Sequence, residues 1–194
     1  MENNRGMTEE TLSRREREKA AHRREIMEAA VRVFARRGFA AATLDEIAQE
    51  AEFSKGALYL YFANKEDLLS TILIDLIQNT ILEGIKSLLP GERSLREELT
   101  ALMHESAAFS FTHKLHMSMS MSLHISQFSG LSQETRTKIM ESHEEVVGVL
   151  HKRLEQAQRN GELRSINLYA AVGMIHGTLD SMVMTRWGTE TAEE

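Results

Sequence analysis

Apolar residues recur at helical spacing in the segment 43–69, and capping residues separate one run from the next. Thr43 followed by Glu46 predicts a capping box, in which the hydroxyl and the carboxylate each accept a backbone N–H. The apolar positions that follow lie three and four residues apart, as on one helix face, and are Leu44, Ile47, Ala48 and Ala51. We therefore expect a short helix that ends at a turn near Glu52.

A second short helix follows and is capped by Ser54. Its inward positions are expected to be Ala57, Leu58, Tyr61 and Phe62. Its outward positions are expected to be Lys55, Gly56, Tyr59 and Leu60. Asn64 then caps a third helix. Two short helices joined by a tight turn predict a helix-turn-helix, whose second helix can enter the major groove of DNA.

Spacing alone leaves two interpretations open, because any pair of antiparallel helices has caps and a turn. The outward face of the second helix favours DNA binding. This helix ends in Tyr-x-Tyr-Phe and is followed by Asn-Lys-Glu, so that phenol, ammonium and helix N-terminal donors share one small patch. Such groups bind phosphates.

The same run resembles the N-terminal DNA-binding domain of TetR-type transcriptional repressors, over residues 20–70. The matching residues are Thr43, Ile47, Ala48, Ala51, Phe53, Ser54, Lys55, Gly56, Leu58, Tyr59, Tyr61, Phe62, Lys65, Glu66, Leu68 and Leu69. The family usually has glycine in the turn, where this chain has Glu52. A left-handed backbone there would cost a non-glycine residue about 1 kcal/mol.

The resemblance implies where DNA would be contacted. Phosphate contacts are expected from Thr43, Tyr61 and Lys65. Contacts with base edges or the groove are expected from Ser54, Lys55, Gly56, Ala57, Tyr59 and Leu60. A glycine at position 56 lets the backbone approach DNA closely, and Lys55 can reach guanine or phosphate.

The periodicity and caps of the remaining chain predict an all-α fold. A long helix is expected from Asn64 to Leu89, broken at Pro90, the only proline in the sequence. Ser94 with Glu97 predicts another capping box, and further helices are expected at 132–160, with Arg153 solvated, and at 166–187. We expect a disordered, basic-leading arm at 1–18, a helix-turn-helix DNA-binding domain at 19–66 and a helical ligand-binding and dimerisation domain at 67–194.

The distribution of charge differs between the two ends of the chain. The net charge is −6, yet residues 14–24 contain six basic and two acidic side chains. One interpretation is a solvated helix face with internal Glu–Arg pairs. The other, favoured by the adjoining helix-turn-helix, is an arm that lies along phosphates or reaches the minor groove.

Composition argues against several other classes of protein. The chain has no cysteine, so disulfides and cysteine metal sites are excluded. Neither a signal core nor an apolar run of roughly 18 residues is apparent, which predicts a cytoplasmic protein without a membrane partner. We find no nucleophile–base pair, glycine-rich phosphate loop or HExxH motif, so an enzyme is not expected, nor is a bound cofactor.

The segment 109–128 is rich in histidine, methionine and serine. On a helix, part of it would form a stripe of imidazoles and thioethers, which suits an adaptable pocket for an apolar or amphipathic effector. The expected pocket residues are Met103, Phe109, His113, Met117, Met121, His124 and Met174. A metal- or haem-sensing regulator of the same fold that uses residues 113–124 is the alternative.

The last helix is apolar around much of its circumference, which predicts burial both in its own domain and against a second copy. The family pairs its last two helices in a four-helix dimer interface. The expected interface residues are Leu150, Leu154, Ala171, Ile175, Leu179 and Met182. By resemblance, the protein is a homodimeric repressor that leaves a palindromic operator in double-stranded DNA when a small molecule binds the C-terminal domain.

Overall fold

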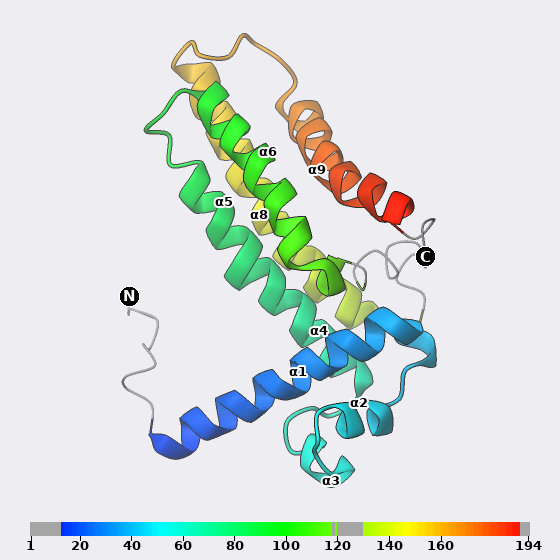
Figure 1. Ribbon diagram of the computed structural model, residues 1–194. Helices are drawn as coiled ribbons and strands as arrows, with labels where there is room; N and C mark the ends of the chain where they lie inside the picture. The colour runs from blue at the N-terminus through cyan, green and yellow to red at the C-terminus, as the bar shows by residue number, and fades with distance from the viewer. Residues whose placement is uncertain (1–12, 118, 120–129, 191–194) are drawn as a thin grey trace.

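The computed structural model describes residues 13–117, 119 and 130–190, with side chains placed up to residue 179. Every regular element in this part of the chain is helical, which confirms the predicted all-α class. The helices are α1 (Arg14–Ala41), α2 (Leu44–Glu50), α3 (Lys55–Leu58), α4 (Lys65–Asp75), η2 (Leu76–Leu82), α5 (Glu83–Leu88), α6 (Leu95–Thr112), α8 (Gln133–Arg159) and α9 (Leu168–Glu190). Helices α1, α2 and α3 form a small N-terminal unit, and the later helices form an elongated bundle beside it (Figure 1).

The predicted caps are present where the sequence placed them. Capping boxes begin α2 and α6, and the side chains of Ser54, Asn64 and Ser132 cap α3, α4 and α8. A further capping box, Ser13 with Glu16, begins α1 at Arg14. Residues 14–18 are therefore the first turn of a helix, which corrects the predicted arm at 1–18.

The helices α4, η2 and α5 follow one another without a break and form one rod, Lys65–Leu88. Its extent agrees with the predicted long helix, but its middle has π-helical hydrogen bonding, a form that is frequent at functional sites. The rod is apolar and long enough to cross a membrane by length and composition, which corrects the expectation that no such run exists. In the fold, its buried apolar side chains belong to a core shared with α1 and α8.

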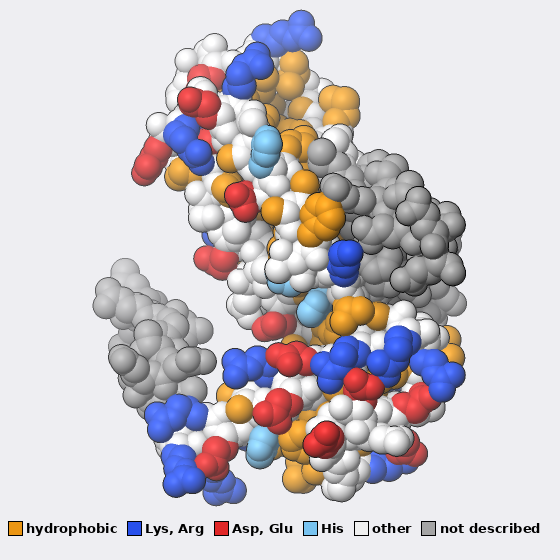
Figure 2. All heavy atoms as spheres, in the orientation of Figure 1, with side chains coloured by type: hydrophobic (Ala, Val, Ile, Leu, Met, Phe, Trp, Pro, Cys, Tyr) orange, Lys and Arg blue, Asp and Glu red, His pale blue; other side chains and the backbone are white. Residues whose placement is uncertain are grey.

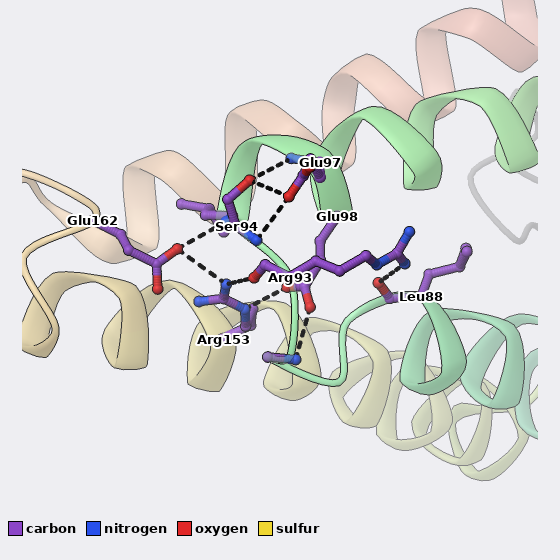
Figure 3. Close-up of polar contacts among 9 residues, drawn as sticks. Leu88, Arg93, Ser94, Glu97, Glu98, Arg153 and Glu162 are labelled. Atoms are coloured by element: carbon purple, nitrogen blue, oxygen red, sulfur yellow. Dashed lines mark hydrogen bonds and ion pairs between the residues drawn. The ribbon is translucent and has the colours of Figure 1, made fainter.

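A buried ion-pair cluster joins α6 to α8 at the end of the bundle far from α1 (Figure 3). The Glu98 carboxylate accepts a hydrogen bond from Nε of Arg153 at 2.5 Å and another from the backbone N–H of Gly91 at 2.8 Å. Arg153 also lies 3.3 Å from Glu162, in the turn between α8 and α9. Glu98 and Arg153 are 0% and 4% exposed, so the prediction of a solvated Arg153 is wrong.

The histidine- and methionine-rich segment begins at the end of α6. Helix α6 ends at Thr112, His113 forms a turn, and residues 114–117 are again helical. Met121 and His124, two of the predicted pocket residues, lie outside the described residues.

Candidate nucleic-acid interface and ligand cavity

The turn between α2 and α3 has the geometry that the sequence predicts. Glu52 has φ of 60°, the left-handed conformation that usually requires glycine. The Ser54 hydroxyl then accepts the backbone N–H of Ala57 at 3.1 Å, which starts α3. Helices α2 and α3 are thereby held as a helix-turn-helix.

The second helix presents an exposed face at the outer end of the molecule. Tyr59 is 49% exposed and Leu60 is 78% exposed, whereas Leu58 between the two helices is fully buried. Ser54, Lys55 and Gly56 are exposed, and Ala57 and Tyr61 are half-buried. A side chain at position 56 would meet no atom within 4 Å, so this glycine leaves open space in front of the helix. These predicted contact residues therefore form one surface.

Lys55 is engaged by an acidic residue that the sequence did not single out. Its Nζ lies 2.7 Å from Oδ1 of Asp45 on α2, and the resulting hydrogen bond raises the pKa of Lys55. Both side chains are exposed. An anion thus lies beside the candidate DNA-contacting cation.

Two of the predicted phosphate contacts lie at the edge of this surface. Thr43 is exposed, and its hydroxyl lies within the capping box of α2. The Tyr61 hydroxyl lies 3.2 Å from Nδ1 of His22 on α1, and the ring of His22 meets Phe53 edge-on. Tyr61 is half-buried, and its hydroxyl faces α1.

Lys65 has a different role from the predicted phosphate contact. Its ammonium donates hydrogen bonds to the carbonyl oxygens of Phe39, Ala40 and Ala42 at 2.6, 3.2 and 2.7 Å. These three acceptors use its three protons. Burial lowers the pKa of Lys65, whose side chain fastens the start of α4 to the end of α1.

The next residue fastens the same helix to the bundle. The Glu66 carboxylate accepts the backbone N–H of Ser132, the N-cap of α8, at 2.7 Å. Hydrogen bonds from Ser132 and Thr135 hold the pKa of Glu66 below its ordinary value. The positive end of the α8 dipole favours a carboxylate there. Sequence reasoning missed this contact, because the partners are 66 positions apart.

Arginines on α1 brace the first helix of the helix-turn-helix. Arg32 and Arg36 each lie 2.7 Å from Glu50, and Arg37 lies 2.8 Å from Glu46. Figure 2 shows lysine and arginine side chains gathered along α1 and its N-terminal end. The basic character of the N-terminal unit thus extends beyond the predicted run at 14–24, to arginines that sequence reasoning did not select.

A cavity of about 580 Å³ lies between the rod, α6, α8 and α9. Its walls are mostly apolar, and the π-helical segment contributes Ile77, Thr80 and Ile81. The polar side chains that line it are Thr80, Ser87, Glu105, Ser106, Thr112, His113, His143 and His176. The volume and the mixture of many apolar walls with few polar groups suit a small-molecule site.

The predicted pocket residues divide between different places. Phe109, His113 and Met117 line the cavity, with the ring of His113 stacked on Phe109 at 4.1 Å between centroids. Met103 lines a separate surface groove beside Leu95, and Met174 is 68% exposed. Met121 and His124 lie outside the described residues.

His143 and His176 also line the cavity, although the sequence did not assign them to the pocket. The structure brings them together in the cavity wall, with their Nε2 atoms 2.8 Å apart. Among the described side chains, no group of three histidine or carboxylate ligands is arranged to hold a metal ion.

The predicted dimer interface needs correction. Leu150, Leu154 and Ala171 are only 1%, 3% and 6% exposed within a single subunit, because they face its own core. Ile175 and Leu179 are half-buried, and the side chain of Met182 lies outside the described part. The exposed apolar side chains of α8 and α9 are instead Met140, Tyr169 and Met174.

Comparison with known proteins gives matches at the level of sequence and fold. The family described as bacterial regulatory proteins, tetR family, matches residues 26–72. The fatty acid metabolism regulator protein of Bacillus subtilis is 28% identical over 163 residues, which cover 83% of this chain and 81% of that protein.

Two solved structures are similar over most of the chain. The fatty acid degradation regulator FadR of Bacillus halodurans has a TM-score of 0.74 and 25% identity, and the match covers 89% of this chain and 86% of that one. FadR of Bacillus subtilis, solved in complex with stearoyl-CoA, has a TM-score of 0.73 and 25% identity, covering 88% and 89%. With the helix-turn-helix described above, these matches indicate a DNA-binding regulator of transcription and not an enzyme. Residues 26–72 thus match the tetR family of bacterial regulatory proteins, and most of the chain is similar in fold to the FadR regulators.

Proposed function

We propose that this protein is a homodimeric repressor that binds a palindromic operator and leaves it when an acyl-CoA thioester occupies the cavity. The observation that carries the proposal is that one continuous helical rod serves both sites. Its first turn is fixed to the helix-turn-helix through Lys65, and its η2 and α5 segments line the cavity. Operator binding places the protein in the cytoplasm, with residues 19–66 as the DNA-binding domain and 67–194 as the effector and dimer domain.

In this proposal α3 enters the major groove. The residues of α3 and its two ends that are offered to base edges and the groove are the exposed Ser54, Lys55, Gly56, Tyr59 and Leu60 and the half-buried Ala57. Thr43 and the Tyr61 hydroxyl contact flanking phosphates. Lys65 makes no DNA contact in this proposal; it stabilises the helix-turn-helix by holding the end of α1.

Two observations support a thioester with an apolar chain as the effector. The cavity has mostly apolar walls and a small set of polar groups, which suits a ligand with one polar function on a long chain. The similar FadR structure from Bacillus subtilis contains stearoyl-CoA. No similar protein reported above supports the alternative, a metal- or haem-sensing regulator that uses residues 113–124.

The coupling follows from rigid connections. A ligand between the rod and α6, α8 and α9 changes how the rod packs, and Lys65 transmits that change to α1 and the helix-turn-helix. Glu66 attaches the same turn of the rod to the N-terminus of α8. Effector and operator then favour different arrangements, with a coupling free energy typically of about 1–3 kcal/mol.

The dimer in this proposal uses the exposed apolar side chains of α8 and α9, namely Met140, Tyr169 and Met174. Two-fold pairing of this surface would present two α3 helices to successive major grooves, which matches a palindromic operator.

The direct test is operator release. A duplex selected from random sequence by the full-length protein is titrated by fluorescence anisotropy with and without saturating stearoyl-CoA, and binding of the effector is checked by calorimetry. We expect stearoyl-CoA to weaken operator binding by about 5–150-fold, the range of typical allosteric couplings. Coenzyme A alone is the control. Unchanged operator affinity with stearoyl-CoA bound would contradict the proposal, and absence of stearoyl-CoA binding would refute the effector class.

Replacing Asp45 by asparagine should strengthen DNA binding, because it removes an anion from the interface and releases Lys55 to a phosphate. The salt dependence should steepen by about 0.9 in the slope of log K against log salt, the value for one more neutralised phosphate. Glu83→Gln is the matched control, because Glu83 pairs with Lys86 on α5 at a similar distance, away from α3. An unchanged slope in Asp45→Asn would show that Lys55 does not reach phosphate.

Replacing Glu66 by alanine should uncouple the two sites, because α4 loses its attachment to the N-terminus of α8. We expect the ratio of operator affinities without and with stearoyl-CoA to fall several-fold toward one, while stearoyl-CoA still binds. Glu134→Ala on the first turn of α8 is the control, since Glu134 pairs with Lys138 and lies on the same helix. If Glu66→Ala kept the wild-type ratio, the junction would have no part in the coupling.

A further inference from the structure

A histidine of α1 touches the tyrosine that is proposed to contact phosphate. His22 is exposed on α1, and its Nδ1 lies 3.2 Å from the hydroxyl oxygen of Tyr61, which follows α3. The ring of His22 also meets the ring of Phe53 edge-on, with centroids 5.2 Å apart. Phe53 belongs to the turn between α2 and α3. Two side chains of the helix-turn-helix therefore hold the imidazole in place.

The hydroxyl of Tyr61 has one hydrogen, and a contact with phosphate needs it, because a phosphate oxygen accepts and does not donate. When Nδ1 of His22 carries no hydrogen, it accepts the hydroxyl hydrogen, and the hydroxyl then has only lone pairs to offer elsewhere. A hydrogen on Nδ1 reverses the bond. The imidazole then donates to the hydroxyl oxygen, and the hydroxyl hydrogen is left for the phosphate.

We propose that His22 is a positioning residue of the DNA interface, which donates from Nδ1 to Tyr61 and so directs the hydroxyl hydrogen of Tyr61 to a phosphate. This inference rests on the proposed phosphate contact of Tyr61 and names the residue that controls it. The Nδ1–H tautomer and the imidazolium both make this bond. The imidazolium also brings a positive charge to the phosphate, so operator binding favours the protonated form of His22.

The charged groups around His22 come from its own helix. Those on the same face of α1, three or four positions away, are Glu18, Lys19 and Glu25. Glu18 is paired with Arg14 at 2.9 Å. From the elements packed against the imidazole, the side chains in contact are the phenol of Tyr61, which can titrate, and the uncharged ring of Phe53. A DNA phosphate at Tyr61 would add an anion beside the imidazole, and we expect it to draw a proton onto His22.

The test is a double-mutant cycle on operator binding. Full-length wild type, His22→Phe, Tyr61→Phe and the double variant are titrated with the selected operator duplex by fluorescence anisotropy. Phenylalanine in place of His22 keeps an aromatic ring against Phe53 and removes the donor. We expect each single change to weaken operator binding by about 5–10-fold per subunit, the equivalent of one hydrogen bond. The second change should add little to the first, because both remove the same phosphate contact.

A conservative variant separates this role from the packing of the ring. His22→Asn places an amide N–H near the position of Nδ1 and has no titrating proton, so it should keep most of the operator affinity. In the wild type, operator affinity should fall as the pH rises from roughly 6 to 8, the range in which histidine side chains titrate, because the complex holds the proton more tightly. His22→Asn should lose that part of the pH dependence. His104→Phe, which replaces an exposed histidine of α6, is the matched control and should keep it.

The outcomes separate this inference from the proposed function. A wild type whose operator affinity is the same at roughly pH 6 and 8 would overturn the inference without the use of any variant. So would wild-type affinity in His22→Phe when Tyr61→Phe is weakened. Both results leave the proposed repressor intact. Full affinity in Tyr61→Phe would remove the phosphate contact on which the inference rests, and failure of the wild type to bind any operator would refute the proposed function itself.

Discussion

The junction at Lys65 and Glu66 is the contact on which the regulatory account depends. Two consecutive residues at the start of α4 hold two different parts of the molecule. The ammonium of Lys65 donates hydrogen bonds to three carbonyl oxygens at the end of α1. The carboxylate of Glu66 accepts a hydrogen bond from the N-cap N–H of α8. In the proposed mechanism, a shift of the rod at its cavity end is passed through these two contacts to the helix-turn-helix. A flexible linker at the same place would separate the two sites.

The two halves of the rod have different surroundings: one packs in the core shared with α1, and the other lines the cavity. The α4 half is buried at Leu68, Leu69 and Ile72 and belongs to the core shared with α1. The η2 and α5 half contributes Ile77, Ile81 and Ile85 to the cavity lining. The π-helical segment η2 begins where the rod passes from the core to the cavity. A departure from regular α-helix is a place where packing can differ between two states at low cost.

Local chemistry made most of the fold predictable. Caps and turns depend on residues three or four positions apart, so Thr43, Ser54, Asn64 and Ser94 mark helix starts correctly, and Glu52 has the left-handed turn expected of it. Contacts between distant residues have no such local signature. Arg153 looks like a solvated helix position until Glu98, 55 positions away, is placed beside it.

The candidate site was predicted unevenly for the same reason. The exposed face of α3 follows from helical periodicity, whereas the pair of His143 and His176 depends on how α8 crosses α9. Apolar positions around a helix do not tell which side faces its own subunit. Leu150 and Leu154 were therefore assigned to the dimer although they are buried in the monomer. The family resemblance implies a phosphate contact for Lys65, and no local pattern indicates that carbonyl oxygens at the end of α1 accept its hydrogen bonds instead.

In the proposed mechanism, an effector in the cavity changes the distance between the two helix-turn-helix units of the dimer. The chain contains no cysteine, so Gln49→Cys, an exposed position of α2, can carry a single spin label per subunit. The distance between the two labels of the dimer is measured by double electron–electron resonance with and without stearoyl-CoA, after the labelled protein has been shown to bind its operator. The account predicts a shifted distance distribution when stearoyl-CoA is bound. An unchanged distribution in a protein that still releases its operator would contradict it.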